Sequence, residues 1–538
     1  MRPAGRGELD SVYFDYPHFD EPRGSRRARL GDPARVAIVG AGPVGMVAAL
    51  TLAREGIRSV LIESKSTFND GSRAICIARQ SFHILQSLGA LEPFLAKALG
   101  WTTGRSFYRG RQILEFTMPD SPSEKFRPMY NLQQQYIEQY LWQAIDRNPL
   151  IDLRWQSRVT GLETRPDGVE LTVSDAQETY KLKAGWLLAA DGARSGIRKA
   201  LGLKLSGENY EGRYVIADIQ MPHDYPTIRR ALFDPDCRPG GTVLIHKQPD
   251  DIWRIDYQLG PGESESEALA EDNVRSSVDL VLKDIGYTGS WDLEWWSIYS
   301  ANTLALDDYR HGRVFFIGDS AHIVPIFGVR GLNNGIADAH NIGWKLGWVL
   351  NGLAGEDLLD SYTPERRGAT LDVFANATRS ARFMTPPSPG WRIMRDAALG
   401  LALEHPFAGD LANPRQMTPF TYAGSPAVLP DRPGFAGGPI PGAAMPDAKV
   451  GGGFLSDLLG SGYTLVCFDR QLSDQVSQLP DAPEVVCLDH PSEASRVLGA
   501  GQRSAYLVRP DLHIAARWLE ASAEGIADAM KTLSFRKD

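Results

Sequence analysis

The stretch Arg35–Gly45, RVAIVGAGPVG, constrains the fold of this chain more than any other part of it. A short apolar run ends in the pattern G-x-G-x-x-G, a helix-forming segment follows up to Gly56, and a second apolar run ends on Glu63. An apolar run of this length is typical of a strand buried on both faces of a parallel sheet. The order of strand, glycine-rich turn, helix, strand and acid predicts a dinucleotide site.

The residue types in this stretch match what a bound pyrophosphate requires. Gly40 allows the tight turn and Gly42 lets backbone N–H groups approach the phosphates, while Gly45 lets the helix pack closely on the strand. The positive end of the helix dipole then faces the phosphates. Glu63 stands where a carboxylate accepts hydrogen bonds from a ribose diol, and Arg73 suits either the pyrophosphate or the protein surface. The alternative is a glycine-rich turn with a purely structural role.

Composition and charge narrow the class of protein. A chain of 538 residues with 43% apolar and 23% charged residues is typical of a globular protein with several structural units. Its net charge of −9 argues against nucleic-acid binding, which needs a basic face. No apolar run reaches membrane-spanning length, and the N-terminal region shows no apolar signal-peptide core. We therefore expect a cytoplasmic protein with no nucleic-acid or membrane partner.

The cysteines and histidines predict no metal site. The ten histidines are scattered, and the four cysteines show neither a CxxC spacing nor a Cys/His ligand spacing. Each cysteine is expected to be a small buried residue in a reducing compartment. They stand at Cys76, Cys237, Cys467 and Cys487.

Two further strand-to-loop junctions present charged residues far along the chain. The apolar run 186–190 leads into Asp191 and a turn with arginines, and the run 313–317 leads into Gly318-Asp319. A glycine-containing loop follows the second junction, and a long amphipathic helix is expected from Asn334. The N-terminus of that helix offers a second electropositive end for an anion or a ring carbonyl.

Between residues 206 and 299 the pattern changes to alternating apolar and polar residues with many aromatics. This pattern is typical of antiparallel strands with one covered face. Such a sheet suits an aromatic ligand, and it equally suits an ordinary aromatic core. Because alternation turns half of the residues outward, only some polar residues can face a ligand. The candidates for catalysis on these strands are His246, Arg254, Tyr257 and Tyr299.

The remaining segments are assigned by composition. Residues 1–34 hold several aromatics and then an arginine-rich patch, and we expect an arm on the surface of the body. Residues 386–450 are rich in proline and glycine and are expected to form connecting helices and loops. From residue 451 a new alternation of strands and helices predicts a separate C-terminal α/β domain over 451–538.

Together, the three separated motifs resemble those of the flavoprotein aromatic hydroxylases, the single-component group typified by para-hydroxybenzoate hydroxylase and phenol hydroxylase. The G-x-G-x-x-G unit with Glu63 is similar to the ADP site for FAD in that family. The stretch Asp191–Arg198 is similar to its D-G motif, which serves both FAD and NAD(P)H. The stretch Gly318–Pro325 is similar to its G-D motif around the ribityl chain and flavin ring, which continues through Gly331, Asn333 and Asp338.

The resemblance implies an α/β fold with three parts. These are a Rossmann-like FAD-binding domain over 35–205 and 300–385, an inserted and mainly antiparallel substrate-binding sheet over 206–299, and a thioredoxin-like domain over 451–538. Without CxxC, that last domain is expected to have no dithiol chemistry and to serve dimer packing.

The resemblance also implies roles for residues around FAD. Arg73 would reach the pyrophosphate, Gln134 would lie near the ribityl chain, and the backbone of Val159 would contact the adenine side. Asp319 would hydrogen-bond the ribityl chain, and the turn at 331–333 would face the flavin ring. The implied cofactor-binding residues are Gly40, Gly42, Pro43, Val44, Gly45, Glu63, Arg73, Gln134, Val159, Asp191, Arg198, Gly318, Asp319, Pro325, Gly331, Leu332 and Asn333.

The implied reaction is hydroxylation of a phenolic or related small aromatic substrate. NADPH or NADH would reduce FAD, and O₂ would form a flavin hydroperoxide whose distal oxygen passes to the ring. One alternative is Baeyer–Villiger or epoxidation chemistry on an aromatic polyketide. Another is a non-catalytic FAD- or NAD-binding scaffold that acts through its C-terminal domain, and a homodimer is compatible with either.

The chain departs from the resemblance beside the expected flavin ring. Many relatives carry a Gly-Gln pair where this chain has Val329 and Arg330. Arg330 either favours an anionic substrate or points away to satisfy loop carbonyls.

Overall fold

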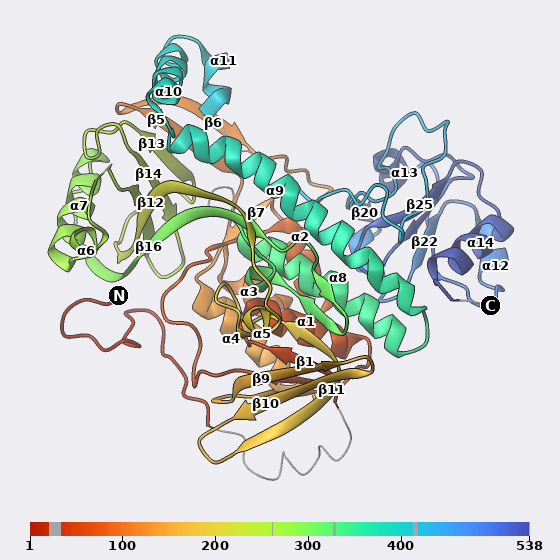
Figure 1. Cartoon of the computed structure of the whole chain (residues 1–538). Coiled ribbons are helices and arrows are strands. Elements are labelled where there is room, and N and C mark those ends of the chain that lie inside the picture. The colour runs from red at the N-terminus through yellow and green to blue at the C-terminus, as the bar shows by residue number, and fades with distance from the viewer. Residues whose placement is uncertain (21–33, 261, 326–329, 413–417, 537–538) are drawn as a thin grey trace.

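The computed structural model describes residues 1–20, 34–260, 262–325, 330–412 and 418–536. Figure 1 shows two large sheets on one side and a smaller C-terminal unit on the other, with the long helix α9 (Tyr362–Met384) running between them. The predicted α/β fold class, with an antiparallel sheet added to a Rossmann-like unit, is confirmed.

The first sheet is built around β1, whose residues Val36–Val39 are buried. β1 pairs in parallel with β2 on one side and with β11 on the other, as expected for an apolar strand covered on both faces. Helix α1 (Pro43–Arg54) contacts both α4 (Gln134–Asp146) and α8 (Gly331–Leu350). In sheet order the strands are β17 (Arg310–His311), β18 (Val314–Phe316), β11 (Thr179–Ala189), β1 (Ala34–Val39), β2 (Ser59–Ile62) and β8 (Ile151–Arg154), and the antiparallel hairpin β9 (Arg158–Arg165) and β10 (Gly168–Ser174) joins at β11.

The second sheet is wider than the sequence predicts. The span 206–299 was expected to form it alone, but β5 and β6, from the span assigned to the FAD-binding domain, complete one edge. β5 pairs in parallel with β13, and a parallel pairing between strands so far apart leaves no local sequence signal. In sheet order the strands are β19 (His322–Ile323), β16 (Asp292–Ala305), β12 (Ser206–Gln220), β15 (Ile252–Gln258), β14 (Thr242–Lys247), β13 (Arg229–Phe233), β5 (Thr103–Tyr108) and β6 (Arg111–Thr117).

One face of this second sheet packs on helix α7 (Glu271–Asp284), whose buried residues include Val274 and Val278. Figure 1 shows α6 and α7 on the outer side of the sheet. The opposite face turns toward the first sheet. A small third sheet and several helices fill in around the two, namely β3 (Cys76–Ala78), β7 (Met129–Asn131), β4 (Leu99–Trp101), α2 (Arg79–Ser87), α3 (Leu91–Lys97), α5 (Gly196–Ala200), α6 (Glu265–Ala268), α10 (Pro389–Ala402) and α11 (Pro406–Gly409).

The C-terminal unit has a four-stranded mixed sheet with its own core, and that core also takes in Trp344 and Trp348 from α8. Cys467 and Cys487, which the sequence treats as isolated, stand opposite each other on the paired strands β22 and β23. The elements are β20 (Lys449–Val450), β21 (Gly453–Phe454), β22 (Thr464–Cys467), α12 (Arg470–Val476), β23 (Glu484–Cys487), α13 (Glu493–Leu498), β24 (Ala505–Val508), β25 (Ile514–Trp518) and α14 (Ala523–Leu533).

Residues 1–20 of the N-terminal arm lie against the body of the protein. The Met1 amino group donates to the Trp296 carbonyl of β16 at 2.6 Å, and Phe14 is buried. Phe19 stacks on Trp155 with ring centroids 4.2 Å apart. The arm therefore contacts both large sheets, while Tyr13, Tyr16 and Phe19 are only half-buried and most of its residues stay exposed or half-buried. These contacts do not contradict the expected surface arm. Most of the arginine-rich patch lies outside the described residues.

Candidate cofactor and substrate site

A cavity of about 1340 Å³ lies between the two large sheets. Single small-ligand pockets are usually about 300–1,000 Å³, so this cavity has room for a dinucleotide and a second molecule. Its lining comes from the glycine-rich turn after β1, the ends of β2 and β11, the strand β9, the start of α8, and the inner face of the second sheet. The segments that the sequence analysis singled out separately thus meet at one cavity.

The glycine-rich turn has the geometry that a close phosphate approach needs. A Cβ on Gly40 would lie 2.4 Å from the Ala190 carbonyl oxygen, and one on Gly45 would lie 1.9 Å from the Gly40 carbonyl oxygen. A Cβ on Gly42 would meet nothing within 4 Å, because this residue faces the cavity at the N-terminus of α1. Pro43 and Val44, the next two residues, also line the cavity.

Glu63 is held in position at the end of β2. One carboxylate oxygen accepts the Ala41 N–H at 2.9 Å, and the other accepts the Lys65 N–H at 3.0 Å. The carboxylate is half-buried and lines the cavity, as a ribose ligand would require. Val159, on β9, lines the same end of the cavity.

Arg73 presents a free cation to the cavity. Its guanidinium makes no hydrogen bond or ion pair with any residue that the structure describes. The Gln134 side-chain oxygen accepts the Arg73 and Ala74 backbone N–H groups, each at 3.2 Å, and the Gln134 amide donates to buried Glu138 at 2.8 Å. Gln134 therefore fixes the backbone that carries Arg73. Because Arg73 lines the cavity, its position favours a contact with the pyrophosphate over a purely surface role.

The two charged residues of the turn after β11, Asp191 and Arg198, have different surroundings. Asp191 lines the cavity, where one carboxylate oxygen accepts the Ile197 N–H at 3.0 Å. Its other oxygen is buried and has no hydrogen-bond partner among the described residues. Arg198 does not line the cavity but donates to the Ser320 and Ala193 carbonyls at 2.9 and 2.6 Å. The prediction that Arg198 binds the cofactor is thus corrected, because its side chain ties this turn to the Gly318 turn.

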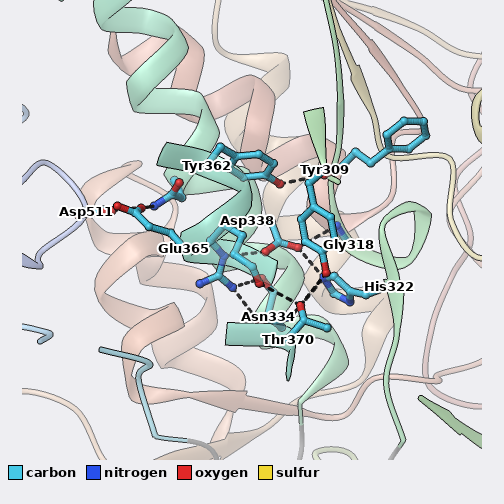
Figure 2. Close-up of polar contacts among 12 residues, drawn as sticks. Tyr309, Gly318, His322, Asn334, Asp338, Tyr362, Glu365, Thr370 and Asp511 are labelled. Atoms are coloured by element: carbon cyan, nitrogen blue, oxygen red, sulfur yellow. Dashed lines mark hydrogen bonds and ion pairs between the residues drawn. The ribbon is translucent and has the colours of Figure 1, made fainter. Parts of the chain in front are cut away.

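The turn at Gly318 and Asp319 is supported from behind by a buried polar network, drawn in Figure 2. The Asp338 carboxylate accepts the Gly318 N–H at 3.0 Å, His322 Nε2 at 2.7 Å and Arg366 Nε at 2.7 Å. Burial alone would raise the pKa of Asp338, but Arg366 and His322 hold it below its ordinary value. Asp338 therefore remains ionised and fixes the turn.

Asp319 itself points the other way, into the cavity. Desolvation raises its pKa, and His322 and Arg73 oppose that rise. Gly318 has φ +60° and packs against Val44 rather than lining the cavity, so its expected contact with the cofactor is corrected to a supporting role.

Helix α8 begins at Gly331, three residues earlier than predicted, and points its N-terminus at the cavity. Pro325, Gly331 and Leu332 line the cavity as expected. Asn333 does not, because its side chain accepts the Ala78 N–H at 2.8 Å and so links α8 to β3. This corrects its expected contact with the ring, since the first helical turn points that side chain away.

Arg330 is buried and directs its guanidinium to the Val373 carbonyl of α9 at 3.5 Å. Arg330 also lines the cavity, so both alternatives for this residue stay predictions. Val329, the other residue of the departure from the resemblance, lies outside the described residues.

Three of the four candidates on the second sheet line the cavity. These are His246, Arg254 and Tyr299, and the Tyr299 hydroxyl donates to the Val324 carbonyl at 2.6 Å. Arg254 forms a buried ion pair with Asp218 at 2.8 Å and donates to the Arg73 carbonyl at 3.1 Å, which makes it a positioning residue. His246 is buried beside positive charge, so desolvation and the nearby arginines hold its pKa well below the ordinary value.

Tyr257 lies on the wrong face. It pairs with Val215 and Val243 on neighbouring strands and packs with them in the core under α7. Arg254 and Asp256 alternate with it and point to the cavity. The expectation of a catalytic Tyr257 is corrected, because the period of two places it on the helix-covered side.

Among the cavity-lining residues that the sequence did not predict, Arg229 and Asp256 carry charge on the second sheet. Both are buried, and desolvation lowers the pKa of Arg229 to about 10 and raises that of Asp256 to about 7. The alternation around Arg254 places Asp256 on the same face and so could have identified it. Nothing in the local pattern distinguishes Arg229 from its neighbour Arg230.

A second buried network ties α8 and α9 to the C-terminal unit. Glu365 accepts Lys345 Nζ at 2.6 Å and Arg509 Nη1 at 2.7 Å, while Asn341 donates to Asp511 at 3.1 Å. Figure 2 shows Glu365 and Asp511 close to the Asp338 network. The support behind the cavity thus extends into the last domain.

Within the described ranges, no helix is both long and apolar enough to cross a membrane. The same residues contain no cluster of three His, Cys, Asp or Glu side chains suited to a metal ion. The cavity offers groups that fit a dinucleotide, namely an unpartnered acidic oxygen on Asp191, the Arg73 cation and the open backbone at Gly42.

Comparison with known proteins agrees with this geometry. A curated 3-(3-hydroxyphenyl)propionate/3-hydroxycinnamic acid hydroxylase from Klebsiella pneumoniae (strain 342) is 29% identical over 369 residues, covering 68% of this chain and 64% of the relative. A protein of the same name from Mycolicibacterium smegmatis is 26% identical over 441 residues, covering 81% of this chain and 77% of the relative. The match to the Klebsiella protein thus spans less than two thirds of its length.

Solved structures share the fold. The flavin-dependent monooxygenase PieE, in complex with FAD and substrate, superposes with a TM-score of 0.78 at 22% identity, over 94% of this chain and 98% of that one. Aklavinone-11 hydroxylase, with FAD and aklavinone, gives 0.76 at 24% identity over 94% and 100% of the two chains. The profile of the family described as "FAD binding domain" matches residues 33–377. With that match over more than half of its length, and with the dinucleotide geometry described above, this chain belongs to the FAD binding domain family.

Proposed function

We propose that this protein is an FAD-dependent monooxygenase that uses NAD(P)H and O₂ to hydroxylate a phenolic or related aromatic substrate. One observation carries the proposal. A single cavity runs from the glycine-rich turn at Gly42, past Asp319 and the start of α8, to the polar inner face of the second sheet at His246. A cofactor and a second molecule can therefore share one space, as a group transfer between them requires. The names of the curated relatives agree with an aromatic substrate.

The residues that would hold FAD follow from the geometry. Gly42 and the N-terminus of α1 suit the pyrophosphate together with Arg73, and Glu63 suits the ribose of the ADP half. Asp319 and the start of α8 suit the ribityl chain and the ring. When bound, FAD would take electrons from NAD(P)H and supply activated oxygen to the substrate.

The second sheet would orient the aromatic ring and handle the proton of its hydroxyl. Ile216 and Leu244 give its inner face apolar surface, and His246 and Asp256 give it polar groups. With a pKa near 7, the Asp256 carboxylate is matched to accept a proton from a phenol around neutral pH, and the resulting phenolate is the more reactive ring. His246, kept neutral by its surroundings, is suited to hydrogen-bond the same hydroxyl.

The test begins with the purified protein. Bound FAD should be visible as a yellow flavin spectrum, and small phenols should stimulate NAD(P)H oxidation with formation of a hydroxylated product identified by mass spectrometry. A folded protein that takes up no flavin, or a flavoprotein whose NAD(P)H oxidation no phenol stimulates, would exclude the proposal and favour a non-catalytic scaffold.

A matched pair of variants assigns the flavin to the proposed site. Gly42→Leu places a side chain where nothing lies within 4 Å, so the fold should survive while the pyrophosphate position is blocked. Gly400→Leu adds the same bulk on α10, also in open space, and should retain FAD. Equal flavin content in the two variants would contradict the assignment.

A second candidate function is oxygenation of a larger aromatic polyketide by Baeyer–Villiger or epoxidation chemistry. The volume of about 1340 Å³ leaves room for such a substrate, and aklavinone-11 hydroxylase was solved with aklavinone bound. Product structure separates the two candidates. The homodimer and the cytoplasmic location remain predictions from the sequence.

A further inference from the structure

The first 20 residues of the arm precede the span 33–377 that the family profile matches, so membership of the family does not account for them. Aromatic packing fixes the middle of this segment. Phe14 is buried, and its ring meets those of Tyr16 and Tyr136 edge-on, with centroids 5.0 and 5.3 Å apart. Burial of such a ring offsets the entropy lost in ordering the chain around it. Tyr16 is therefore presented from an ordered segment.

A buried ion pair attaches the arm to the second sheet. Arg2 pairs with Glu294 of β16, and their side chains are only 4% and 1% exposed. The same carboxylate accepts Ser11 Oγ at 2.6 Å and the Val12 N–H at 3.0 Å. Arg2 also donates from Nη2 to the Tyr16 hydroxyl at 3.2 Å. Because a buried, fully hydrogen-bonded charge is costly to separate from its partners, this end of the arm is held in place.

The Tyr16 hydroxyl joins the arm to the loop that carries Arg73. It accepts the Gly71 N–H at 3.3 Å and Gln135 Nε2 of α4 at 2.9 Å. Gly71 also packs closely on the second sheet, because a Cβ at this position would lie 1.9 Å from the ring of Trp295, which lines the cavity. The arm thus reaches the point where the loop passes between the two sheets.

The backbone of this loop is held by three separate parts of the chain. The Gln134 side chain of α4 accepts the Arg73 and Ala74 N–H groups at 3.2 Å, and Arg254 of β15 donates to the Arg73 carbonyl at 3.1 Å. Tyr16 supplies the third attachment and is the one that does not line the cavity. The Arg73 guanidinium has no partner among the described residues, so its position depends on how this backbone is held.

We propose that Tyr16 is a positioning residue for the cofactor, and that by holding the Gly71 N–H it sets where the Arg73 guanidinium meets the pyrophosphate of FAD. A guanidinium matches a phosphate only when its paired N–H groups are correctly placed. Holding such a group in place before the ligand arrives strengthens binding without a new contact. This inference rests on the assignment of Arg73 to FAD under the proposed function.

The test is a double-mutant cycle on the deflavinated full chain, with the dissociation constant of FAD measured by quenching of its fluorescence. Arg73→Met removes a charged contact and should raise this constant about 10- to 100-fold. Tyr16→Phe removes one neutral hydroxyl and should raise it about 3- to 10-fold. In the Arg73→Met background, Tyr16→Phe should add less than about twofold, because its effect acts through Arg73. A general loss of structure would add in full in both backgrounds.

Tyr13→Phe is the matched control. Tyr13 lies three residues earlier in the same arm and is also half-buried, with its ring centroid 6.0 Å from that of Tyr136. Its hydroxyl makes no hydrogen bond with a residue that the structure describes. Its loss should leave the dissociation constant of FAD unchanged within about twofold.

A second measurement needs no variant. Coupling between two sites is reciprocal, so FAD should slow amide hydrogen exchange in arm peptides over residues 11–17 as well as in loop peptides over residues 69–75. Exchange is compared in the unmodified protein with and without FAD. This measurement decides the inference even if Tyr16→Phe does not fold.

Four results would overturn the inference: equal dissociation constants for Tyr16→Phe and Tyr13→Phe, an unchanged constant in Arg73→Met, full additivity of the two substitutions, or arm exchange that FAD does not alter. Failure of the proposed function gives a different result. A protein that binds FAD with the stated coupling, but whose NAD(P)H oxidation no phenol stimulates, would exclude the monooxygenase alone. A protein that takes up no FAD would overturn both.

Discussion

Two buried charged clusters border the same cavity, and they differ in how their charges are satisfied. Behind the Gly318 turn, Asp338 accepts hydrogen bonds from a backbone N–H, from His322 and from Arg366, all within 3.0 Å. On the second sheet, Arg229 and Asp256 are also buried, but neither has a polar partner for its cavity-facing group among the described residues.

This difference indicates that one cluster supports the fold and the other recognises a ligand. A paired buried charge fixes the position of its neighbours and is costly to break, whereas an unpaired one lowers stability until a ligand arrives. The Asp338 cluster is therefore suited to fix the shape of the cofactor end, and the cluster of Arg229 and Asp256 to recognise what enters the other end. Each of the following predictions tests this contrast.

The largest expected effect is the loss of Asp338. Asp338→Ala leaves the Arg366 guanidinium buried without its carboxylate, which should lower the free energy of unfolding by about 3–5 kcal/mol and reduce FAD retention. Denaturant unfolding and flavin content measure both. Asp360→Ala is the control, since its 2.6 Å ion pair with Arg310 is exposed and should contribute about 1 kcal/mol or less. Similar losses for the two variants would remove the distinction between the clusters.

Asp256→Asn should raise the free energy of unfolding, and the size of this gain should depend on pH. Burial raises the folded-state pKa of Asp256 from 3.8 to about 7, with Arg254 and Arg229 opposing and Asp218 assisting the rise. A raised acid pKa means that the unmodified protein loses stability between about pH 4 and pH 7, while the carboxyl ionises only in the unfolded chain. The variant should therefore be more stable at pH 8, by an amount on the order of a few kcal/mol, and equal at pH 4. Unfolding at the two pH values measures this.

The same carboxyl predicts a kinetic signature. If Asp256 accepts the phenol proton, kcat/KM of the unmodified protein should rise with pH through about 7, because only the ionised form accepts a proton. Asp256→Asn should lower kcat/KM by about 10²- to 10⁴-fold and abolish that inflection. An unchanged pH profile in the variant would assign the proton to another group.

Arg229→Met should leave the free energy of unfolding unchanged or raise it by about 1 kcal/mol, since a buried unpaired charge is replaced by an apolar side chain of similar length. Thermal unfolding of the ligand-free protein measures this. A loss as large as that of Asp338→Ala would mean that Arg229 supports the fold, and the contrast between the clusters would fail.

The smallest effect is expected for Tyr257→Phe. Tyr257 packs with Val215 and Val243 in the core under α7, away from the cavity. Turnover and the ratio of product to NAD(P)H consumed should stay within experimental error, with a stability change of about 1 kcal/mol or less. His246→Ala is the comparison, because His246 lines the cavity and its loss should slow hydroxylation. Uncoupling in Tyr257→Phe would contradict the assignment of faces.

Much of the cofactor end could be predicted because its signals are local. Gly40, Gly42 and Gly45 serve a turn whose steric needs are set by residues a few positions away, and each has the predicted geometry. Glu63 lies at the end of the next strand, where its carboxylate accepts the Ala41 N–H. The motif match also predicts that the side chains of Arg198 and Asn333 contact the cofactor, whereas both bind protein groups behind the cavity. A motif does not record whether a side chain faces the ligand or supports the turn from behind.

The amino-acid sequence by itself determined the α/β fold class and the position of the FAD-type turns, because backbone sterics and strand-to-helix order depend on near neighbours in the chain. Only the tertiary structure decided which charges are paired. Strand register sets the faces of Arg229, Asp256 and Tyr257, and the partners of Asp338 come from segments far apart in the chain. Pairing of a buried charge depends on what the fold brings within hydrogen-bond distance, and no local pattern of residues records that distance.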